Sequence, residues 1–208
     1  AERIAAVSGA TFRRAPSRHE GDDPETAPPA AVSGGDDMPF APADGGIQGS
    51  TLRGLIIHKL LEEVLTGETR EPDMAERAEA LLGQLDREPE DDPSNGPNPA
   101  EMAATAERAL ACPEIAEVRD KLAPEIVVAN SNADERGETI VSGVADAVAV
   151  DSAGMPSVVV DWKSDVAPDE SRRKLYRVQL RDYLNACQAE RGLIVYATSG
   201  YAEPVKPQ

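Results

Sequence analysis

The chain has 208 residues and a formal net charge of −17, so it is long enough for one domain with a sizeable core plus appendages. It contains no apolar run of about 18 residues and no secretory signal at its start, and we expect a soluble, cytoplasmic protein that does not enter a membrane. Its two cysteines, Cys112 and Cys187, cannot alone build a zinc site or an iron–sulfur cluster. The sequence lacks a Gly-x-x-x-x-Gly-Lys-Ser/Thr segment, which excludes an ATP-driven motor within this chain.

The first part of the chain, residues 1–48, is poor in large apolar residues and rich in Pro, Gly and Asp, a composition typical of a linker or a disordered segment. Residues 20–44 hold seven acidic residues and no Lys or Arg, so much of the negative charge is expected at the periphery. Because the sequence starts with Ala1 and not with methionine, we expect a fragment of a longer protein. Residues 49–208 are predicted to form the folded domain.

Apolar residues at helical spacing follow the linker, and a strand-like pattern follows them. The predicted helices cover residues 52–65, 73–85, 98–112 and, as a short turn, 113–118. The predicted strands cover residues 125–129, 139–150, 157–161 and 192–198, with one more helix over 171–190. This order of helices, three strands, a helix and a strand predicts an α/β domain with a central mixed β-sheet flanked by helices.

The segment over residues 143–163 carries the strongest chemical signal. Two apolar, β-branched runs are joined by the turn-prone sequence Asp151-Ser-Ala-Gly154, which predicts a β-hairpin. The hairpin would bring Asp146, Asp161 and Lys163 together at one rim that solvent reaches, and strand alternation places the last two on one face. Two carboxylates beside an ammonium suit a hard divalent cation and an anionic substrate, the parts that phosphodiester hydrolysis requires. A simple ion pair between Asp161 and Lys163 is the alternative.

Four further side chains are candidates for the same site, and each has a simpler structural alternative. His58 is predicted on the apolar face of the first helix together with Leu55, where it could be a core or surface histidine instead of a metal ligand. Glu125 starts a strand and could face solvent. Gln179 and Tyr183 lie on one face of the last helix and could belong to a core-facing stripe, although a buried amide would need hydrogen-bond partners.

Five basic residues lie between positions 172 and 181 of the last predicted helix, with the acidic Asp182 just beyond them. They are Arg172, Arg173, Lys174, Arg177 and Arg181. This group, which we call the basic strip, could contact the phosphates of a nucleic acid or could form a solvated helix face. The overall negative charge opposes nucleic-acid binding, which is largely electrostatic, so the local distribution of charge decides between these interpretations.

One family shows the same residues in the same order. The order His58, Glu125, Gly143-x-x-Asp146, Asp161-x-Lys163 and Gln179-x-x-x-Tyr183 resembles the PD-(D/E)xK nuclease superfamily over roughly residues 50–200. Within it, the chain resembles the RecB-like nuclease domain at the C-terminus of bacterial helicase–nucleases that process double-strand DNA breaks. Asp-x-Lys alone is a weak signal, whereas the five-part order is specific. The resemblance implies a restriction-endonuclease-like core with a helical N-terminal part.

The resemblance also implies a role for each matching residue. The ligands of a Mg²⁺ or Mn²⁺ ion would be the side chains of His58, Asp146 and Asp161 and the backbone carbonyl of Trp162. Lys163 would orient the attacking water or stabilise the transition state, and Glu125 would support the metal or its water shell. Gln179 and Tyr183 would position DNA and the loop at the active site.

DNA phosphates would be bound by the first four residues of the basic strip, which are Arg172, Arg173, Lys174 and Arg177. The four cysteines that hold an iron–sulfur cluster in some members of this family are absent, so we expect no cluster.

The implied function is a Mg²⁺- or Mn²⁺-dependent deoxyribonuclease, with exonuclease action favoured over endonuclease action. A single-stranded DNA end is the expected substrate, in double-strand break repair. The expected partners are a helicase motor region of the same polypeptide and a second subunit. Two alternatives stay open: a catalytically inactive DNA-binding or subunit-interface module, and a stand-alone exonuclease or restriction-type enzyme.

Overall fold

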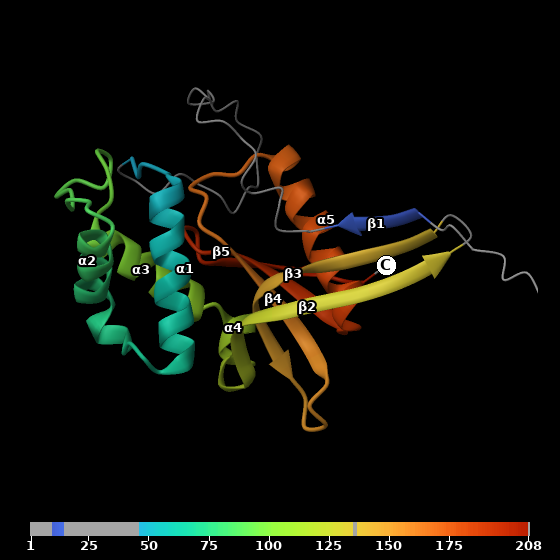
Figure 1. Ribbon diagram of the computed structural model, residues 1–208. Helices are drawn as coiled ribbons and strands as arrows, with labels where there is room; N and C mark the ends of the chain where they lie inside the picture. Colours follow the sequence, from blue (N-terminus) through green and yellow to red (C-terminus); the bar gives the residue numbers. More distant parts are fainter. Residues whose placement is uncertain (1–9, 15–45, 135–136, 208) are drawn as a thin grey trace, which may run out of the picture.

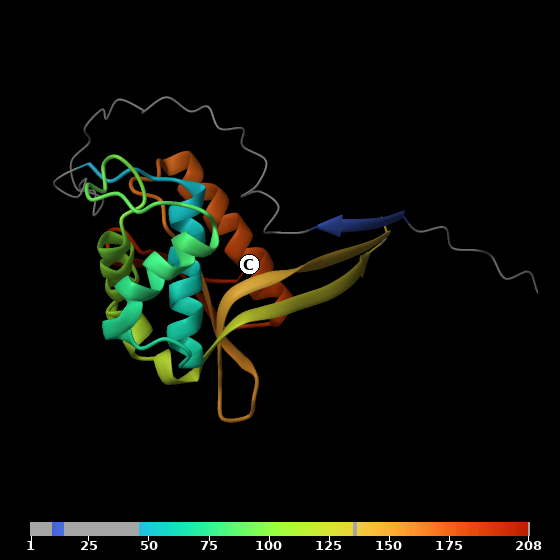
Figure 2. The same ribbon diagram turned by 60° about the vertical axis from the view of Figure 1, so that its left-hand side comes forward.

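The structure is a computed structural model that describes residues 10–14, 46–134 and 137–207. A six-stranded mixed sheet has the order β1-β3-β4-β5-β6, and β2 pairs with β3 beside this path. Helices α1 to α4 cover one face of the sheet and α5 covers the other (Figures 1 and 2). The predicted fold class, an α/β domain with a mixed sheet flanked by helices, is therefore confirmed.

The helices begin and end where the sequence supplies caps. The Ser50 side chain accepts a hydrogen bond from the Arg53 N–H at the start of α1, and Gly67 ends that helix in the left-handed conformation with a φ of 81°. The helices are α1 (Thr51–Thr66), α2 (Met74–Gln84), α3 (Pro99–Leu110), α4 (Pro113–Ala116) and α5 (Glu170–Cys187), with short 3₁₀ helices η2 (Glu71–Asp73) and η3 (Arg119–Lys121). In the described part of the chain, none of these helices has the length and apolar character needed to cross a membrane.

The strands are more numerous than the sequence pattern predicts, and β2, β3 and β4 are longer than predicted. They are β1 (Ala10–Arg14), β2 (Leu122–Asp134), β3 (Gly137–Val150), β4 (Pro156–Lys163), β5 (Arg191–Tyr196) and β6 (Tyr201–Val205). The predicted hairpin between β3 and β4 is confirmed: the Gly154 N–H donates to the Asp151 carbonyl at 3.0 Å, and Gly154 has a φ of 79°. The strands β1 and β6 were not predicted.

One edge of β3 changes partner along its length, and this change positions the site. Residues 137–141 pair with β1, and residues 147–150 pair with β4. Residues 142–146 have neither partner on that edge, while their other edge is paired with β2 apart from an interruption at Asp146. This stretch, which we call the β3 gap, contains Gly143 and Asp146, so among the described residues the ladder is interrupted at the Gly-x-x-Asp motif.

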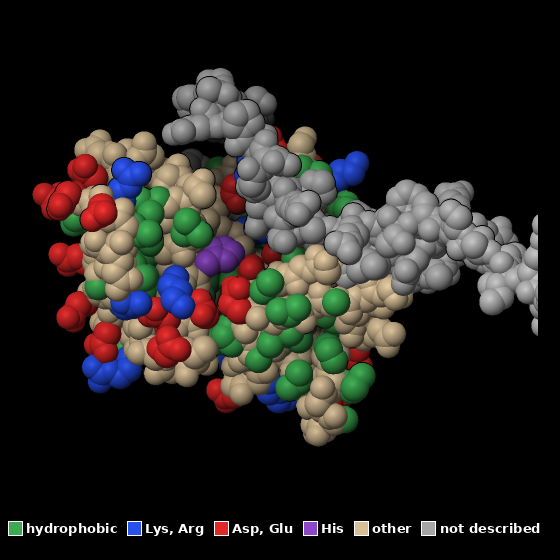
Figure 3. Space-filling model, viewed as in Figure 1, with side chains coloured by type: hydrophobic (Ala, Val, Ile, Leu, Met, Phe, Trp, Pro, Cys, Tyr) green, Lys and Arg blue, Asp and Glu red, His purple; other side chains and the backbone are tan. Residues whose placement is uncertain are grey.

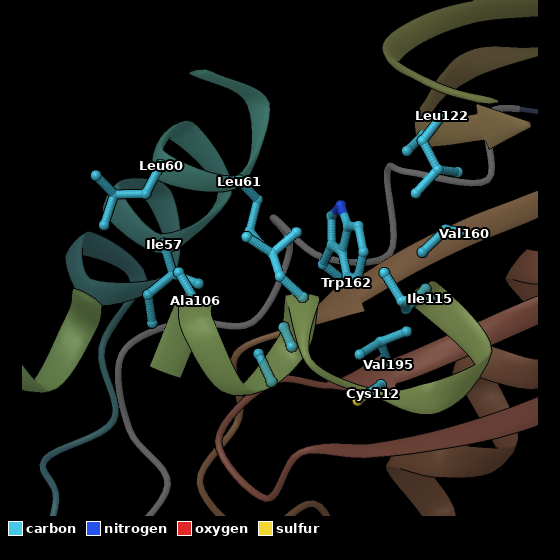
Figure 4. Close-up of a cluster of buried hydrophobic side chains, with 14 of the residues drawn as sticks. Ile57, Leu60, Leu61, Ala106, Cys112, Ile115, Leu122, Val160, Trp162 and Val195 are labelled. Atoms are coloured by element: carbon cyan, nitrogen blue, oxygen red, sulfur yellow. The ribbon is translucent and has the colours of Figure 1, made fainter. Parts of the chain in front are cut away.

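The larger apolar cluster lies between the sheet and helices α1 to α4. Figure 4 shows Ile57, Leu60 and Leu61 of α1 on one side and Trp162, Val160 and Val195 of the sheet on the other. Its members Val158, Val160 and Trp162 alternate along β4, as expected for one face of a strand. The smaller cluster lies under α5 and contains Tyr176, Leu180, Tyr183 and Leu184 of that helix.

The predicted linker, residues 1–48, lies mostly outside the described residues. Its described parts are β1, which runs parallel to β3, and residues 46–48, where the Gln48 N–H donates to the Pro93 carbonyl at 2.8 Å. The predicted boundary of the nuclease domain at residue 49 stays a prediction.

Candidate active site

Strand β4 divides its side chains between the two faces of the sheet. Trp162 enters the large cluster, whereas Asp161 and Lys163 lie on the α5 face, 4% and 3% exposed. The Lys163 Nζ lies 3.2 Å from Asp161 Oδ2 and donates to Gln179 Oε1 at 3.2 Å. The expectation of a solvent-reached rim is therefore wrong for these two side chains, because α5 packs over them. A charge pair is stable in such a place only when hydrogen bonds compensate its desolvation.

Asp146 lies at the end of the β3 gap, beside the backbone of β4. Its Oδ2 accepts a hydrogen bond from the Trp162 N–H at 2.7 Å. The carboxylate thus satisfies a strand N–H at the point where the β3–β4 ladder stops after the pair Ala147–Val160. The backbone of Trp162 consequently lies next to Asp146, as the predicted ligand role requires, while that role for its carbonyl stays a prediction.

His58 approaches Asp146 from the side of the sheet that α1 covers. Its Nδ1 lies 3.7 Å from Asp146 Oδ1, and its side chain is partly exposed. The expectation that His58 shares an apolar face with Leu55 is wrong in one respect, since Leu55 is 62% exposed and the buried face of α1 carries Ile56, Ile57 and Leu60 instead. His58 therefore lies at the border of the core, where it can reach the open edge of the sheet.

Glu125 stands opposite Asp146 on β2, in an unusual backbone conformation. The neighbouring pairs are Pro124–Ala147 and Ile126–Ala145, and the ladder is interrupted between them. Glu125 has a φ of 53°, in the left-handed region that costs a non-glycine residue about 1–2 kcal/mol. Strain of this kind gathers at functional sites, which supports a role for this exposed carboxylate.

The charges around Glu125 come mainly from α1. Burial and the charge of Glu62 raise the pKa of the Glu125 carboxyl, while His58 and Lys59 act in the opposite direction. Glu62 and His58 are therefore close enough to act on the Glu125 carboxyl. A cation bound nearby would reduce the repulsion between the two carboxylates.

The donor set suits a hard divalent ion. Carboxylate oxygens and one imidazole, without a thiolate, favour Mg²⁺ or Mn²⁺ over softer metals. Two ligand atoms at right angles around Mg²⁺ lie about 3 Å apart, so His58 and Asp146 need only a small approach to share an ion. Among the described residues, no three His, Cys, Asp or Glu side chains already stand close enough to hold one. The predicted triad of His58, Asp146 and Asp161 is thus gathered around β3 and β4 without forming a closed cage.

Tyr183 and Gln179 contact other residues of the candidate site. A Cβ built on Gly143 would lie 2.8 Å from the Tyr183 hydroxyl oxygen, so the absence of a side chain at position 143 lets this buried ring pack against the β3 gap. The partner that the buried Gln179 amide needs is Lys163. A direct contact of Gln179 or Tyr183 with DNA stays a prediction.

The basic strip is largely compensated by nearby acids. Arg172 Nε lies 3.2 Å from Asp165 Oδ1, and Arg177 Nη1 lies 2.6 Å from Glu170 Oε1. Arg173 also pairs with Glu170, and Arg177 pairs with Glu203 as well. The strip therefore has less free positive charge than its sequence suggests, and its contact with DNA phosphates stays a prediction.

Sequence reasoning missed a buried arginine that braces the site. Arg53 is 2% exposed and binds Glu101 through two hydrogen bonds of 2.8 and 2.6 Å. Its Nη1 donates at 2.5 Å to the carbonyl of Ser164, the residue after Lys163, and its Nη2 donates to Thr198 at 3.2 Å. The sequence places Arg53 in helical register with Ile57 and Leu60. A charged residue on that apolar face was the signal that could have revealed its burial.

None of the curated proteins matches the chain. Among solved structures, the one titled "Crystal structure of SSO0001" is 17% identical, over 76% of this chain and 80% of that chain, with a TM-score of 0.36, which is too low to carry an argument. A model of the PD-(D/E)XK nuclease superfamily matches residues 40–203, which include every candidate site residue. The chain therefore belongs to the PD-(D/E)XK nuclease superfamily.

Proposed function

We propose that this chain is a Mg²⁺- or Mn²⁺-dependent deoxyribonuclease that hydrolyses phosphodiester bonds. The observation that carries the proposal is the position of Lys163, whose buried ammonium is held by Asp161 and Gln179 one strand away from Asp146. A cation in a structural ion pair is easily replaced by apolar residues, so its burial here favours a chemical role.

Some of the candidate catalytic residues would stabilise charge, and the others would hold the ion in position. A bound divalent ion would polarise the phosphoryl oxygen and acidify a water molecule. Lys163 would stabilise the negative charge that develops on the phosphoryl oxygens, and it is oriented for this by Asp161 and Gln179. Asp146, held by the Trp162 N–H, and His58 would hold the ion, with Asp161 and the Trp162 carbonyl as the further ligands.

The finer proposal concerns substrate and context. We propose exonuclease action at a single-stranded DNA end, in a helicase–nuclease that processes double-strand breaks, with the motor region in the same polypeptide and a second subunit as a partner. The charge of the chain supports this context. Its net charge is −17 and the basic strip is mostly paired, so another part of the assembly has to supply much of the grip on DNA.

The experiment compares cleavage of labelled linear DNA, single-stranded DNA, RNA and circular DNA by the purified chain. Each substrate is incubated with Mg²⁺, with Mn²⁺ and with excess EDTA. We expect cleavage of DNA with either ion and none with EDTA, and protection of circular single-stranded DNA would indicate exonuclease action. Cleavage in EDTA at the rate seen with Mg²⁺ would contradict the metal-dependent mechanism.

A metal-binding measurement separates this proposal from a second candidate function. The incomplete gathering of the three predicted ligands favours a catalytically inactive DNA-binding or subunit-interface module as the alternative. Electron paramagnetic resonance of added Mn²⁺ would count bound ions in the wild type, in Asp146→Asn and in His58→Ala. Loss of Mn²⁺ binding in both variants supports the nuclease, whereas equal weak binding by all three chains, together with no cleavage, supports the inactive module.

A further inference from the structure

Tyr176 of α5 lies directly against the ammonium of Lys163. The Nζ atom lies 4.5 Å from the centroid of the ring, within the range of a cation–π contact. Both side chains are buried, with exposures of 6% for Tyr176 and 3% for Lys163. The ring therefore bounds the ammonium on one side, while Asp161 and Gln179 bind it from others.

The hydroxyl of Tyr176 is fixed by two charged groups. It donates a hydrogen bond to Asp165 Oδ2 at 2.7 Å and accepts one from Arg172 Nε at 2.7 Å. Burial and then Asp165 raise the pKa of the Tyr176 phenol, so it stays protonated and continues to donate. The far end of the ring is thus tied both to the loop after β4 and to the previous turn of α5.

These contacts form a closed ring of interactions around the end of β4. The polypeptide connects Lys163 to Asp165, which lies two residues later. Asp165 binds the Tyr176 hydroxyl, and the ring of Tyr176 contacts the Lys163 ammonium. The backbone of the same segment is held independently, because the Ala197 N–H donates to the Lys163 carbonyl at 2.8 Å. With both its backbone and its head group fixed, the lysine loses much of the freedom that its long side chain normally has.

From this geometry we propose that Tyr176 is a positioning residue for Lys163: its ring holds the ammonium in the direction of the scissile phosphate, and Asp165 and Arg172 hold the ring. The inference rests on the proposed nuclease function for its consequence in catalysis. A polar side chain at this position would compete with substrate for the ammonium protons. An aromatic face attracts the charge without accepting a hydrogen bond in the usual manner, so it can restrain the ammonium and leave it available to phosphate oxygens.

The test uses two substitutions that separate the ring from the hydroxyl. Tyr176→Phe keeps the ring, and Tyr176→Leu keeps an apolar side chain without it; Leu175→Ala, at an exposed neighbouring position, is the matched control. We expect kcat for DNA cleavage to fall about 2- to 30-fold in Tyr176→Leu, the range of a cation–π contact, with KM nearly unchanged. Tyr176→Phe should keep most of the wild-type kcat.

A second measurement does not depend on cleavage. Brief acetylation of the folded chain with acetic anhydride, followed by peptide mass spectrometry, reports how accessible Lys163 is. We expect Lys163 to be protected in the wild type, in Tyr176→Phe and in Leu175→Ala, and to be acetylated faster in Tyr176→Leu. Urea unfolding of each variant shows whether it is folded under these conditions.

The outcomes distinguish this inference from the proposed function. If Tyr176→Leu matches the wild type in kcat and in acetylation, the ring does not position Lys163. If Tyr176→Phe is as impaired as Tyr176→Leu, the hydroxyl network and not the ring is responsible, and the inference is also wrong. If the wild type itself does not cleave DNA, the proposed function fails, while acetylation still tests the contact between the ring and Lys163.

Discussion

The two faces of the sheet use the same strands for different purposes. On the face covered by α1 to α4, β4 contributes Val158, Val160 and Trp162 to a large apolar cluster. On the face covered by α5, the same strand contributes Val159 and then Asp161 and Lys163. The first face buries apolar area and supplies stability, whereas the second buries charge, which costs free energy unless every group is paired.

The two sides of the molecule also differ in the side chains at their surfaces. Figure 3 shows acidic side chains spread over the helices at one side and apolar side chains gathered over the β2–β3 hairpin at the other. Val127 of β2 and Val144 of β3, which pair with each other in the sheet, are 77% and 40% exposed. The β3 gap lies at the border of these regions, where His58 of α1 can meet Asp146 from one face and α5 can cover Lys163 from the other. An opening in the sheet thus lets both faces contribute to one site.

The largest effect is expected when the charges of the α5 face are removed. In the double variant Asp161→Asn with Lys163→Met, DNA cleavage should fall by at least about a thousandfold, because the groups that stabilise the transition state are gone. Replacing both members of a buried ion pair is commonly neutral for stability or better, so the free energy of unfolding should be unchanged or higher. Cleavage assays and urea unfolding check the two parts separately.

The single substitutions are the controls for this double variant. Asp161→Asn alone and Lys163→Met alone each leave one buried charge without its partner, and each should be less stable than the double variant. If the double variant were the least stable of the three, the charge pair would be a structural element. The contrast between a stabilising face and a chemical face would then no longer hold.

The second prediction removes the centre of the other face. Trp162→Ala should lower the free energy of unfolding by about 3–5 kcal/mol, because a fully packed ring is replaced by a cavity. At a temperature where the variant is still folded, cleavage should stay within a few fold of the wild type, since the Trp162 group that binds Asp146 is its backbone N–H, which the substitution keeps. A thousandfold loss of cleavage in a folded Trp162→Ala variant would show that this side chain belongs to the catalytic region.

The fold was largely predictable because local patterns and tertiary packing agree over most of the chain. Helix α3, for example, starts at Asn98-Pro99, where the Asn98 side chain accepts from the Glu101 N–H at 2.8 Å. The strand β6 was not predicted, because Tyr201-Ala-Glu-Pro-Val205 contains a proline and only two buried side chains. It pairs with β5 at the edge of the sheet, where a proline is tolerated.

For the candidate site, the sequence predicted the positions of side chains along the strands but not their environment. The spacing of Asp161 and Lys163 gave their common face, yet their burial depends on how closely α5 approaches the sheet. Gly192, where a Cβ would lie 2.7 Å from Leu180, permits that approach, and no local pattern reveals it. Arg53 and Tyr176 were not placed in the site for the same reason, because their partners Ser164 and Lys163 come from other elements.

The third prediction concerns acid unfolding and the brace behind the active site. Burial alone would raise the pKa of the Glu101 carboxyl, but hydrogen bonds from Arg53 and Thr105 outweigh it and hold the pKa below the ordinary value of 4.5. The folded state therefore binds the proton less readily than the unfolded state. The stability from this group is fully present above pH 4.5 and is lost as the pH falls through the folded pKa.

Glu101→Gln should accordingly cost about 1.5–3 kcal/mol at pH 7, the range for a hydrogen bond to a charged partner. The difference from the wild type should shrink as the pH is lowered from 5 toward 3, and urea unfolding at a series of pH values measures it. The exposed Glu79→Gln is the matched control and should leave the curve unchanged. A constant difference at every pH would mean that protonation of Glu101 does not contribute.

The smallest expected effect concerns the basic strip. Replacing Arg172, Arg173 and Lys174 by glutamine should weaken DNA binding only about two- to fivefold, because Arg172 and Arg173 already have acidic partners and Lys174 is a single exposed charge. Mn²⁺ binding should not change, because none of the three residues is a predicted metal ligand. Fluorescence anisotropy with labelled single-stranded DNA at several salt concentrations gives both the affinity and its salt dependence.

Glu170→Gln tests the same idea in the opposite direction. Glu170 pairs with both Arg173 and Arg177, so its neutralisation should release positive charge at the strip and strengthen DNA binding by a similar factor. The salt dependence should become steeper in this variant and shallower in the triple variant, since each added phosphate contact increases the slope by somewhat less than one. If both variants bind DNA like the wild type at every salt concentration, the strip is a solvated helix face. The grip on DNA would then have to come from other residues or from a partner.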